Sequence, residues 1–169
     1  MKTNLKFKKF SLISILIAVS LILGYVDSLI EFNVGIVGLR VGIANIVTLI
    51  AFKSLDLKSA FLINVIRVII LNMIFGNTIR FVISASGFLL SFMVMSLLFY
   101  RLRFSIITTS IFGGVTHNIG QILSALILVK NVRLVLATPL FTFVGILTGI
   151  VIGVLSTLII NKISNIVFE

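Results

Sequence analysis

An uncharged run of 26 residues, Phe104–Val129, constrains the fold of this chain more than any other stretch. Folded as an α-helix it would be about 39 Å long, enough to cross the hydrocarbon core of a bilayer with some tilt. The chain has 169 residues, of which 60% are hydrophobic and 11% are charged, and soluble domains do not have this composition. We therefore predict an all-α integral membrane protein.

Five further apolar runs are separated by short segments that contain charged residues, glycine or proline. We interpret the chain, 1–169, as a single transmembrane domain with six helices near 10–29, 36–53, 59–75, 81–100, 104–129 and 138–160. Glycines at four-residue spacing let two helices approach closely. This spacing relates Gly38 to Gly42 in the second span, and Gly145, Gly149 and Gly153 in the sixth. We predict close helix packing at both places.

The basic residues lie mainly at the ends of the apolar runs, which is typical of membrane topology rather than of a nucleic-acid-binding patch. The net charge of +10 is therefore no sign of a nucleic-acid partner. Six spans put both termini on one side of the membrane. With a cytoplasmic N-terminus, nine basic residues lie inside and four lie outside, which follows the positive-inside rule and predicts cytoplasmic termini. The inside residues are Lys2, Lys6, Lys8, Lys9, Lys53, Lys58, Arg101, Arg103 and Lys162, and the outside ones are Arg40, Arg80, Lys130 and Arg133.

The fifth span carries a polar stripe that would lie on one side of a helix. His117 and Gln121 are one helical turn apart, so their side chains point into the same space. Unpaired polar groups are costly within a membrane, and ionisable residues there often mark a functional site. We predict that His117, Asn118 and Gln121 line a substrate-binding cavity. The alternative is that the stripe only forms hydrogen bonds between helices.

Arg67 lies near the centre of the third span, with Asn64 one turn before it on the same side. A mid-membrane arginine costs roughly 2.5–3.5 kcal/mol on insertion scales, so it needs a partner or water. We predict that Arg67 and Asn64, together with Asn45 and Arg40 of the second span, also contact the substrate. Arg40 lies near a helix end, where its side chain could instead extend to the interface.

The charge on Arg67, Arg40 and Arg80 leaves two interpretations open. Asp27 and Glu31, two of the four acidic residues, could neutralise it by ion pairing inside the protein. If the charge is not fully paired, the ligand should carry a carboxylate or phosphate beside an apolar or aromatic body. The sequence does not choose among isoprenoid diphosphates, quinone precursors and vitamin-like acids.

Three blocks, taken in order, carry a resemblance to a known family: Gly38–Leu49, Arg67–Gly76 and Gly113–Gln121. They resemble heptaprenyl diphosphate synthase component I, also called the Gx transporter family, and the likeness runs from about Ser11 to Ile160. The block His-Asn-x-Gly-Gln is its most specific part. That family is in turn similar to the substrate-binding S components of energy-coupling factor (ECF) transporters.

The resemblance implies an S-component-like helix bundle in the bacterial plasma membrane. Such a subunit captures a small anionic, partly apolar nutrient or a cofactor or isoprenoid precursor for uptake. It is surrounded by membrane lipid and docks on a transmembrane scaffold that carries two ATPase subunits. S components often dock through an Ala-xxx-Ala step on the first helix, and the nearest match here is Ser14 and Ala18. A second departure is Phe88, which stands where a second glycine is expected in the fourth span.

The alternative function is that of a non-catalytic membrane component of a heptaprenyl diphosphate synthase, in menaquinone side-chain synthesis. Prenyl transfer needs clustered aspartates to hold Mg²⁺, and the two aspartates, Asp27 and Asp56, are far apart in the sequence. No phosphate-binding motif for ATP hydrolysis is present, and the chain has no cysteine. We therefore predict no catalytic activity of the chain alone, no metal site and no cofactor.

Overall fold

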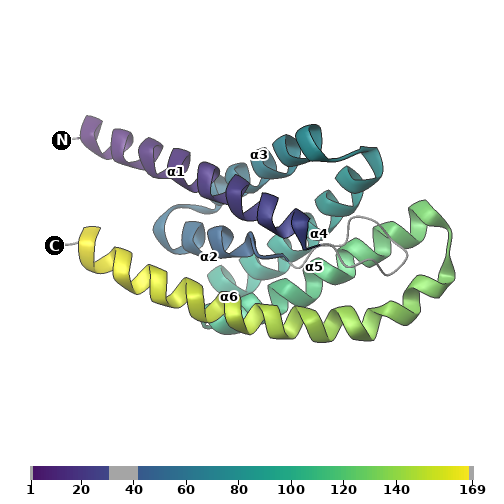
Figure 1. Ribbon diagram of the computed structural model, residues 1–169. Helices are drawn as coiled ribbons and strands as arrows, with labels where there is room; N and C mark the ends of the chain where they lie inside the picture. The colour runs from purple at the N-terminus through teal and green to yellow at the C-terminus, as the bar shows by residue number, and fades with distance from the viewer. Residues whose placement is uncertain (1, 31–41, 168–169) are drawn as a thin grey trace.

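The computed structural model describes residues 2–30 and 42–167, and the side chains of residues 6–30 and 42–163. Within these residues the chain is helical, without strands (Figure 1). Five segments are long and apolar enough to cross a membrane, which supports a membrane protein. The elements are α1 (Lys2–Leu29), α2 (Asn45–Ser54), α3 (Leu57–Phe75), α4 (Thr78–Ser96), the π-helical turn η1 (Leu97–Arg101), α5 (Ile106–Val129), the 3₁₀ segment η2 (Val132–Ala137) and α6 (Thr138–Val167).

Helix α5 is the centre of the bundle. It packs along α4 and along α6, and these are the two most extensive helix contacts among the described elements. Helix α3 packs against α4, and the short α2 connects α6 back to α3, so these five helices form a closed circuit of neighbours. Helix α1 lies outside this circuit, mainly against α3 (Figure 1).

The glycines of α6 pack directly against the backbone of α5. A Cβ atom added at Gly145 would lie 2.9 Å from the carbonyl group of Gly114, and one added at Gly149 would lie 2.6 Å from Cα of Ile111. One added at Gly153 would lie 2.8 Å from Cα of Ile107. The predicted packing role of these three glycines is therefore confirmed.

The second predicted span, 36–53, is helical in the structure from Asn45 onward, but its described beginning, residues 42–44, is wrong because it precedes helix α2. Gly42 is not helical: its φ of +87° lies in the left-handed region, which glycine adopts at little cost. The predicted helical step from Gly38 to Gly42 is therefore wrong at Gly42, and Gly38 lies outside the described residues. The ten residues of α2 span about 15 Å, half of the hydrocarbon thickness.

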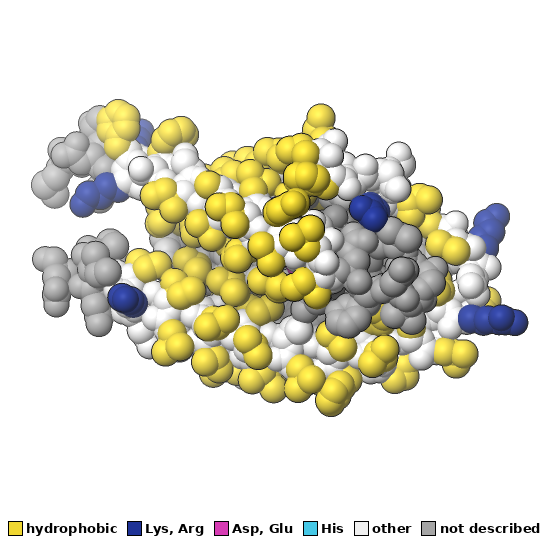
Figure 2. Space-filling view, viewed as in Figure 1, with side chains coloured by type: hydrophobic (Ala, Val, Ile, Leu, Met, Phe, Trp, Pro, Cys, Tyr) yellow, Lys and Arg dark blue, Asp and Glu magenta, His cyan; other side chains and the backbone are white. Residues whose placement is uncertain are grey.

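Both ends of the described chain lie at the same end of the bundle (Figure 1). Lys9 of α1 bonds to Asp56 in the α2–α3 turn, and the Tyr100 hydroxyl of η1 donates to the Phe52 carbonyl of α2, so these turns belong to that end too. Hydrophobic side chains cover most of the face in Figure 2, and most basic side chains visible there lie at its two ends. This distribution suits a bundle whose ends are in water and whose middle is in lipid.

Lys9→Ala should raise the pKa of Asp56 toward its ordinary value. The Lys9 ammonium, 2.8 Å from the Asp56 carboxylate, is the largest cause that holds this pKa well below 3.8, and the Ser59 hydroxyl adds a hydrogen bond. The pKa is depressed in the folded state, so the stabilisation is present above pH 3.8 and is lost as the pH falls toward the folded value. Because the pair is exposed, it should contribute at most about 1 kcal/mol.

An NMR pH titration of Asp56 measures this shift directly. Lys8→Ala is the matched control, because Lys8 is exposed on the same helical turn and forms no ion pair with the described residues. An unchanged Asp56 titration in the Lys9 variant would contradict the assignment.

Candidate functional site

A small internal cavity lies where four helices and the segment before α2 meet. The enclosed space is about 20 Å³, which is room for roughly one water molecule. Charged and polar side chains from distant parts of the sequence border it, which is unusual for the interior of a membrane bundle. The lining residues are Gly24 and Asp27 of α1, Ala44, Arg67, Val68 and Leu71 of α3, Ser84 of α4, and His117 and Gln121 of α5.

Helix α5 contributes His117 and Gln121, which are both buried and, as predicted, point the same way. The side-chain nitrogen of Gln121 lies 2.9 Å from Nε2 of His117. An amide nitrogen can only donate, so with this amide orientation His117 Nε2 accepts and the proton of a neutral ring lies on Nδ1. Gly87 of α4 lies directly opposite, since a Cβ there would come within 2.7 Å of Gln121 Cγ. The polar turn of α5 is thus held tightly against α4.

Helix α3 contributes Arg67, which is only 5% exposed. Its aliphatic stem packs against Gly24 of α1, where an added Cβ would lie 3.4 Å from Arg67 Cδ. The prediction that Arg67 is a buried cation is therefore correct, and Arg67 lines the same cavity as His117 and Gln121.

Asp27 is a residue whose position in the site the sequence did not reveal. It lies near the end of α1, where an acidic residue would ordinarily mark the end of a span, but it is only 4% exposed. The Gly42 N–H donates to both carboxylate oxygens, at 3.0 and 3.1 Å. Asp27 thus joins the end of α1 to the segment that leads into α2.

Ser84 of α4 is a second residue that was not predicted as a site residue. It borders the cavity, is 5% exposed, and its hydroxyl forms no hydrogen bond with any described residue. A buried hydroxyl at a polar cavity is a place for a ligand atom or a water molecule. Its position on the same face as Gly87 and Ser91 was the signal in the sequence.

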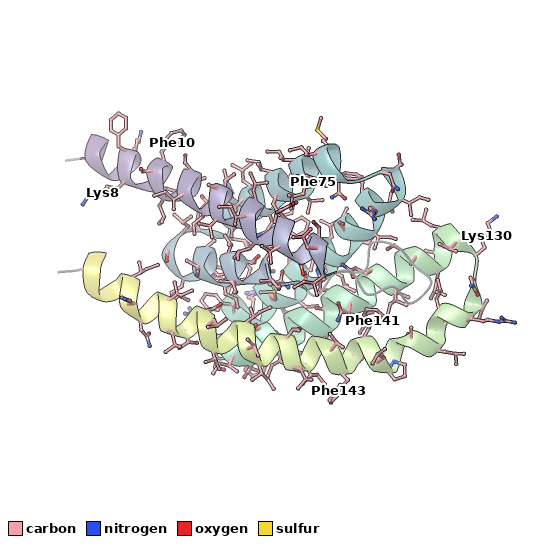
Figure 3. All side chains as sticks on the ribbon, viewed as in Figure 1. Lys8, Phe10, Phe75, Lys130, Phe141 and Phe143 are labelled. Atoms are coloured by element: carbon pink, nitrogen blue, oxygen red, sulfur yellow. The ribbon has the colours of Figure 1, made fainter. Side chains whose placement is uncertain are left out.

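Asn118 and Asn64, two other predicted residues, do not border this cavity. Asn118 lies about 100° around α5 from His117, and its amide donates at 2.8 Å to the carbonyl of Phe141 in α6, which is labelled in Figure 3. Asn64 accepts from Thr48 of α2 at 3.0 Å and donates to Ala60 of its own helix. The prediction that Asn118 shares the space of His117 is therefore corrected, because the two side chains leave α5 in different directions.

Asn45 and Arg40 complete the predicted set. Asn45 is buried at the start of α2, and its amide nitrogen has no hydrogen-bond partner among the described residues. It lies beside Gly42, close to the His117 ring, but outside the cavity lining. Arg40 lies outside the described residues.

The lining residues provide hydrogen-bonding and charged groups that can bind a ligand. The Ser84 hydroxyl is not hydrogen-bonded to His117, although a serine nucleophile requires such a bond to a base. The described residues contain no group of three or more histidine, cysteine or acidic side chains placed to hold a metal ion. What the lining residues offer is one carboxylate, one guanidinium, an imidazole, an amide and a hydroxyl.

Comparison with known proteins identifies the family of the chain. The family model for heptaprenyl diphosphate synthase component I matches residues 16–159. The chain belongs to this family. No curated protein and no solved structure matches it. The match covers every residue of the cavity and all of helices α2 to α5, so this component I family includes the part of the chain that builds the site.

Proposed function

We propose that this chain is a non-catalytic, solute-binding membrane subunit of the S-component type, which captures a small anionic solute at the Arg67–His117 cavity. The observation that supports this most is the convergence of buried polar groups from α1, α3, α4 and α5 on one space. Burying such groups in a lipid-embedded bundle is costly unless they are hydrogen-bonded or paired, and ionisable residues at this depth often mark a functional site. Close helix packing alone does not need them, since the glycines of α6 achieve it without polar groups.

We propose an anionic ligand from the hydrogen-bond donors of the lining residues, among which the Asp27 carboxylate also lies. The guanidinium group of Arg67 and the Ser84 hydroxyl both suit a carboxylate or a phosphate oxygen. The cavity of about 20 Å³ is too small for more than a water molecule. Binding of a larger solute therefore requires one wall to move.

Helix α1 is the wall best suited to such movement. Within the described residues it packs mainly on α3 and less on α2, and it lies outside the circuit formed by the other helices. It also contributes Gly24 and Asp27 to the cavity. An outward shift of α1 would enlarge the space without disturbing the tightly packed α4–α5–α6 core.

The outer face of α1 is also the proposed docking surface for an energising module. Ser14 and Ala18 are both exposed there, so a partner helix could approach closely. In this proposal the partner is a transmembrane scaffold with two ATPase subunits. The end of the bundle that holds both termini faces the cytoplasm of a bacterial cell, in agreement with its basic residues.

A second function is favoured by the family description itself. A component I implies a further component, so the chain would be the membrane partner of a separate prenyl synthase. Affinity purification of the tagged chain from mild detergent distinguishes the two functions. Recovery of a transmembrane scaffold with two ATPases supports the first, and recovery of a soluble prenyl synthase supports the second. Elongation of isoprenoid diphosphates by the purified chain alone would contradict both.

His117→Ala should abolish or weaken solute retention, and it should lower stability only modestly through loss of the buried hydrogen bond to Gln121. Native mass spectrometry of the detergent-extracted protein measures retention, and thermal unfolding measures stability. Asn118→Ala is the matched control, because it removes the hydrogen bond to Phe141 one residue away. This control should lower stability by about 0.6–2 kcal/mol and leave retention unchanged. If His117→Ala behaves like the control, the polar stripe only holds helices together.

A further inference from the structure

A second concave surface lies on the outside of the bundle, away from the Arg67–His117 cavity. It is a groove of about 620 Å³ between the start of α3 and the second half of α4 with η1. Its walls are apolar along most of their length, and one end carries a polar rim. The groove is lined by Leu57, Leu90, Met93, Val94, Ser96, Leu97, Tyr100 and Arg101.

The groove has the length of one membrane leaflet. From Leu90 to Arg101 the lining residues recur at helical spacing on one face of α4 and η1. The eleven steps between these two residues, at a rise of about 1.5 Å each, span roughly 16 Å, about half of a 30 Å hydrocarbon core. Met93 and Leu97 are 67% and 52% exposed, so the apolar floor is open to whatever surrounds the bundle.

The polar end of the groove is strongly basic. Arg101 borders the groove itself, and Lys53, Lys58 and Arg103 are exposed on the adjoining turns. Asp56 is the acidic side chain described at this end, and Lys9 already pairs with it. The positive charge that remains suits an anionic headgroup at the membrane surface.

The shape of the polar end is held by the protein rather than by a ligand. Tyr100 donates from its hydroxyl to the Phe52 carbonyl at 3.0 Å, which fixes the ring as one wall. Leu97, Tyr100 and Arg101 belong to a π-helical turn, closed by the bond from Leu102 N to Leu97 O at 3.1 Å. Such turns are rare and frequently occur at functional sites.

We propose that this groove binds one anionic phospholipid of the surrounding leaflet. An acyl chain lies along Leu90, Met93 and Leu97, and the phosphate headgroup contacts Arg101. A linear isoprenoid diphosphate has the same general chemistry, but a lipid of the bilayer is already present at this depth and orientation. The site is independent of the solute cavity and of either function proposed above.

Native mass spectrometry tests the proposal on protein equilibrated with phosphatidylglycerol or phosphatidylcholine. The wild-type protein should retain one phosphatidylglycerol in preference to phosphatidylcholine. Arg101→Gln should reduce this preference about fivefold, the usual effect of one basic residue at a membrane surface. Arg133→Gln is the matched control, because Arg133 is exposed in η2, outside the groove lining, and should leave the preference unchanged.

Val94→Trp provides a second variant that fills the groove without changing charge. It should reduce retention of both lipids while the unfolding temperature stays near that of the wild type. Equal retention by the Arg101 and Arg133 variants would overturn the proposal. Displacement of phosphatidylglycerol by an equal concentration of farnesyl diphosphate would also overturn it, in favour of an isoprenoid site.

Discussion

Gly114→Ala is expected to destabilise the protein by about 1–3 kcal/mol, despite the better helix propensity of alanine. Its Cβ would collide with the carbonyl oxygen of Gly145. The contact is reciprocal, because a Cβ added at Gly145 would lie 2.9 Å from the carbonyl group of Gly114. Both obstacles are backbone atoms, so no side chain can rotate away and α5 must separate from α6. Reversible unfolding in mixed micelles measures the loss.

The neighbouring Gly113→Ala is the matched control for this effect. The three atoms nearest to an added Cβ there all belong to the side chain of Met95. Methionine is unbranched and adapts its conformation readily, so this variant should lose far less stability than Gly114→Ala. Similar losses in the two variants would show that general crowding, rather than backbone contact between α5 and α6, limits the packing.

Asp27→Ala is expected to cost about 1.5–3 kcal/mol, because it removes a buried hydrogen bond to a charged acceptor. The Asp27 carboxylate accepts from the Gly42 N–H, and Gly42 holds its left-handed conformation at the entry to α2. Loss of the carboxylate should therefore also release this segment. Faster amide hydrogen exchange at Gly42 would report the release, and thermal unfolding would report the stability.

Two further variants separate the hydrogen bond from other effects at the end of α1. Asp27→Asn keeps one acceptor oxygen without the charge, so it should lose less stability than the alanine variant. Ser28→Ala removes a hydroxyl whose hydrogen bond among the described residues is to the Tyr25 carbonyl of its own helix, and it should change little. If the Gly42 amide hydrogen exchanges as slowly in the Asp27→Ala variant as in the Ser28→Ala variant, the Asp27 carboxylate does not hold the segment before α2.

The helices and their close packing were predictable from the sequence for a general reason. Lipid offers no hydrogen bonds to the backbone, so long apolar runs must be helical. Glycines at four-residue spacing remove side chains from one side of a helix, and Gly145, Gly149 and Gly153 accordingly meet the backbone of α5. Helical geometry alone also predicted that Gln121 lies beside His117, because the two residues are four positions apart.

The makeup of the site depends on contacts between residues far apart in the sequence. Asp27 and Gly42 are separated by 15 residues, and no local pattern shows that the carboxylate turns inward to bond the Gly42 N–H. The Asp27–Gly42 hydrogen bond lies just before α2, which begins only at Asn45, whereas the apolar composition predicted a helix that crosses the membrane. Asn118 and Ser84 also depend on tertiary contacts. Each is a polar residue in an apolar helix, and the sequence does not show which neighbouring helix its side chain meets.

By itself, then, the sequence determined that this chain is a helical membrane protein with tightly packed helices and a polar centre, because composition and helical periodicity act locally. Only the tertiary structure decided which polar residues form that centre. The role of each polar side chain depends on the helix that packs against it. The Asn118 amide donates to the Phe141 carbonyl of α6. Asp27 of α1 and Ser84 of α4 instead line the same cavity as His117.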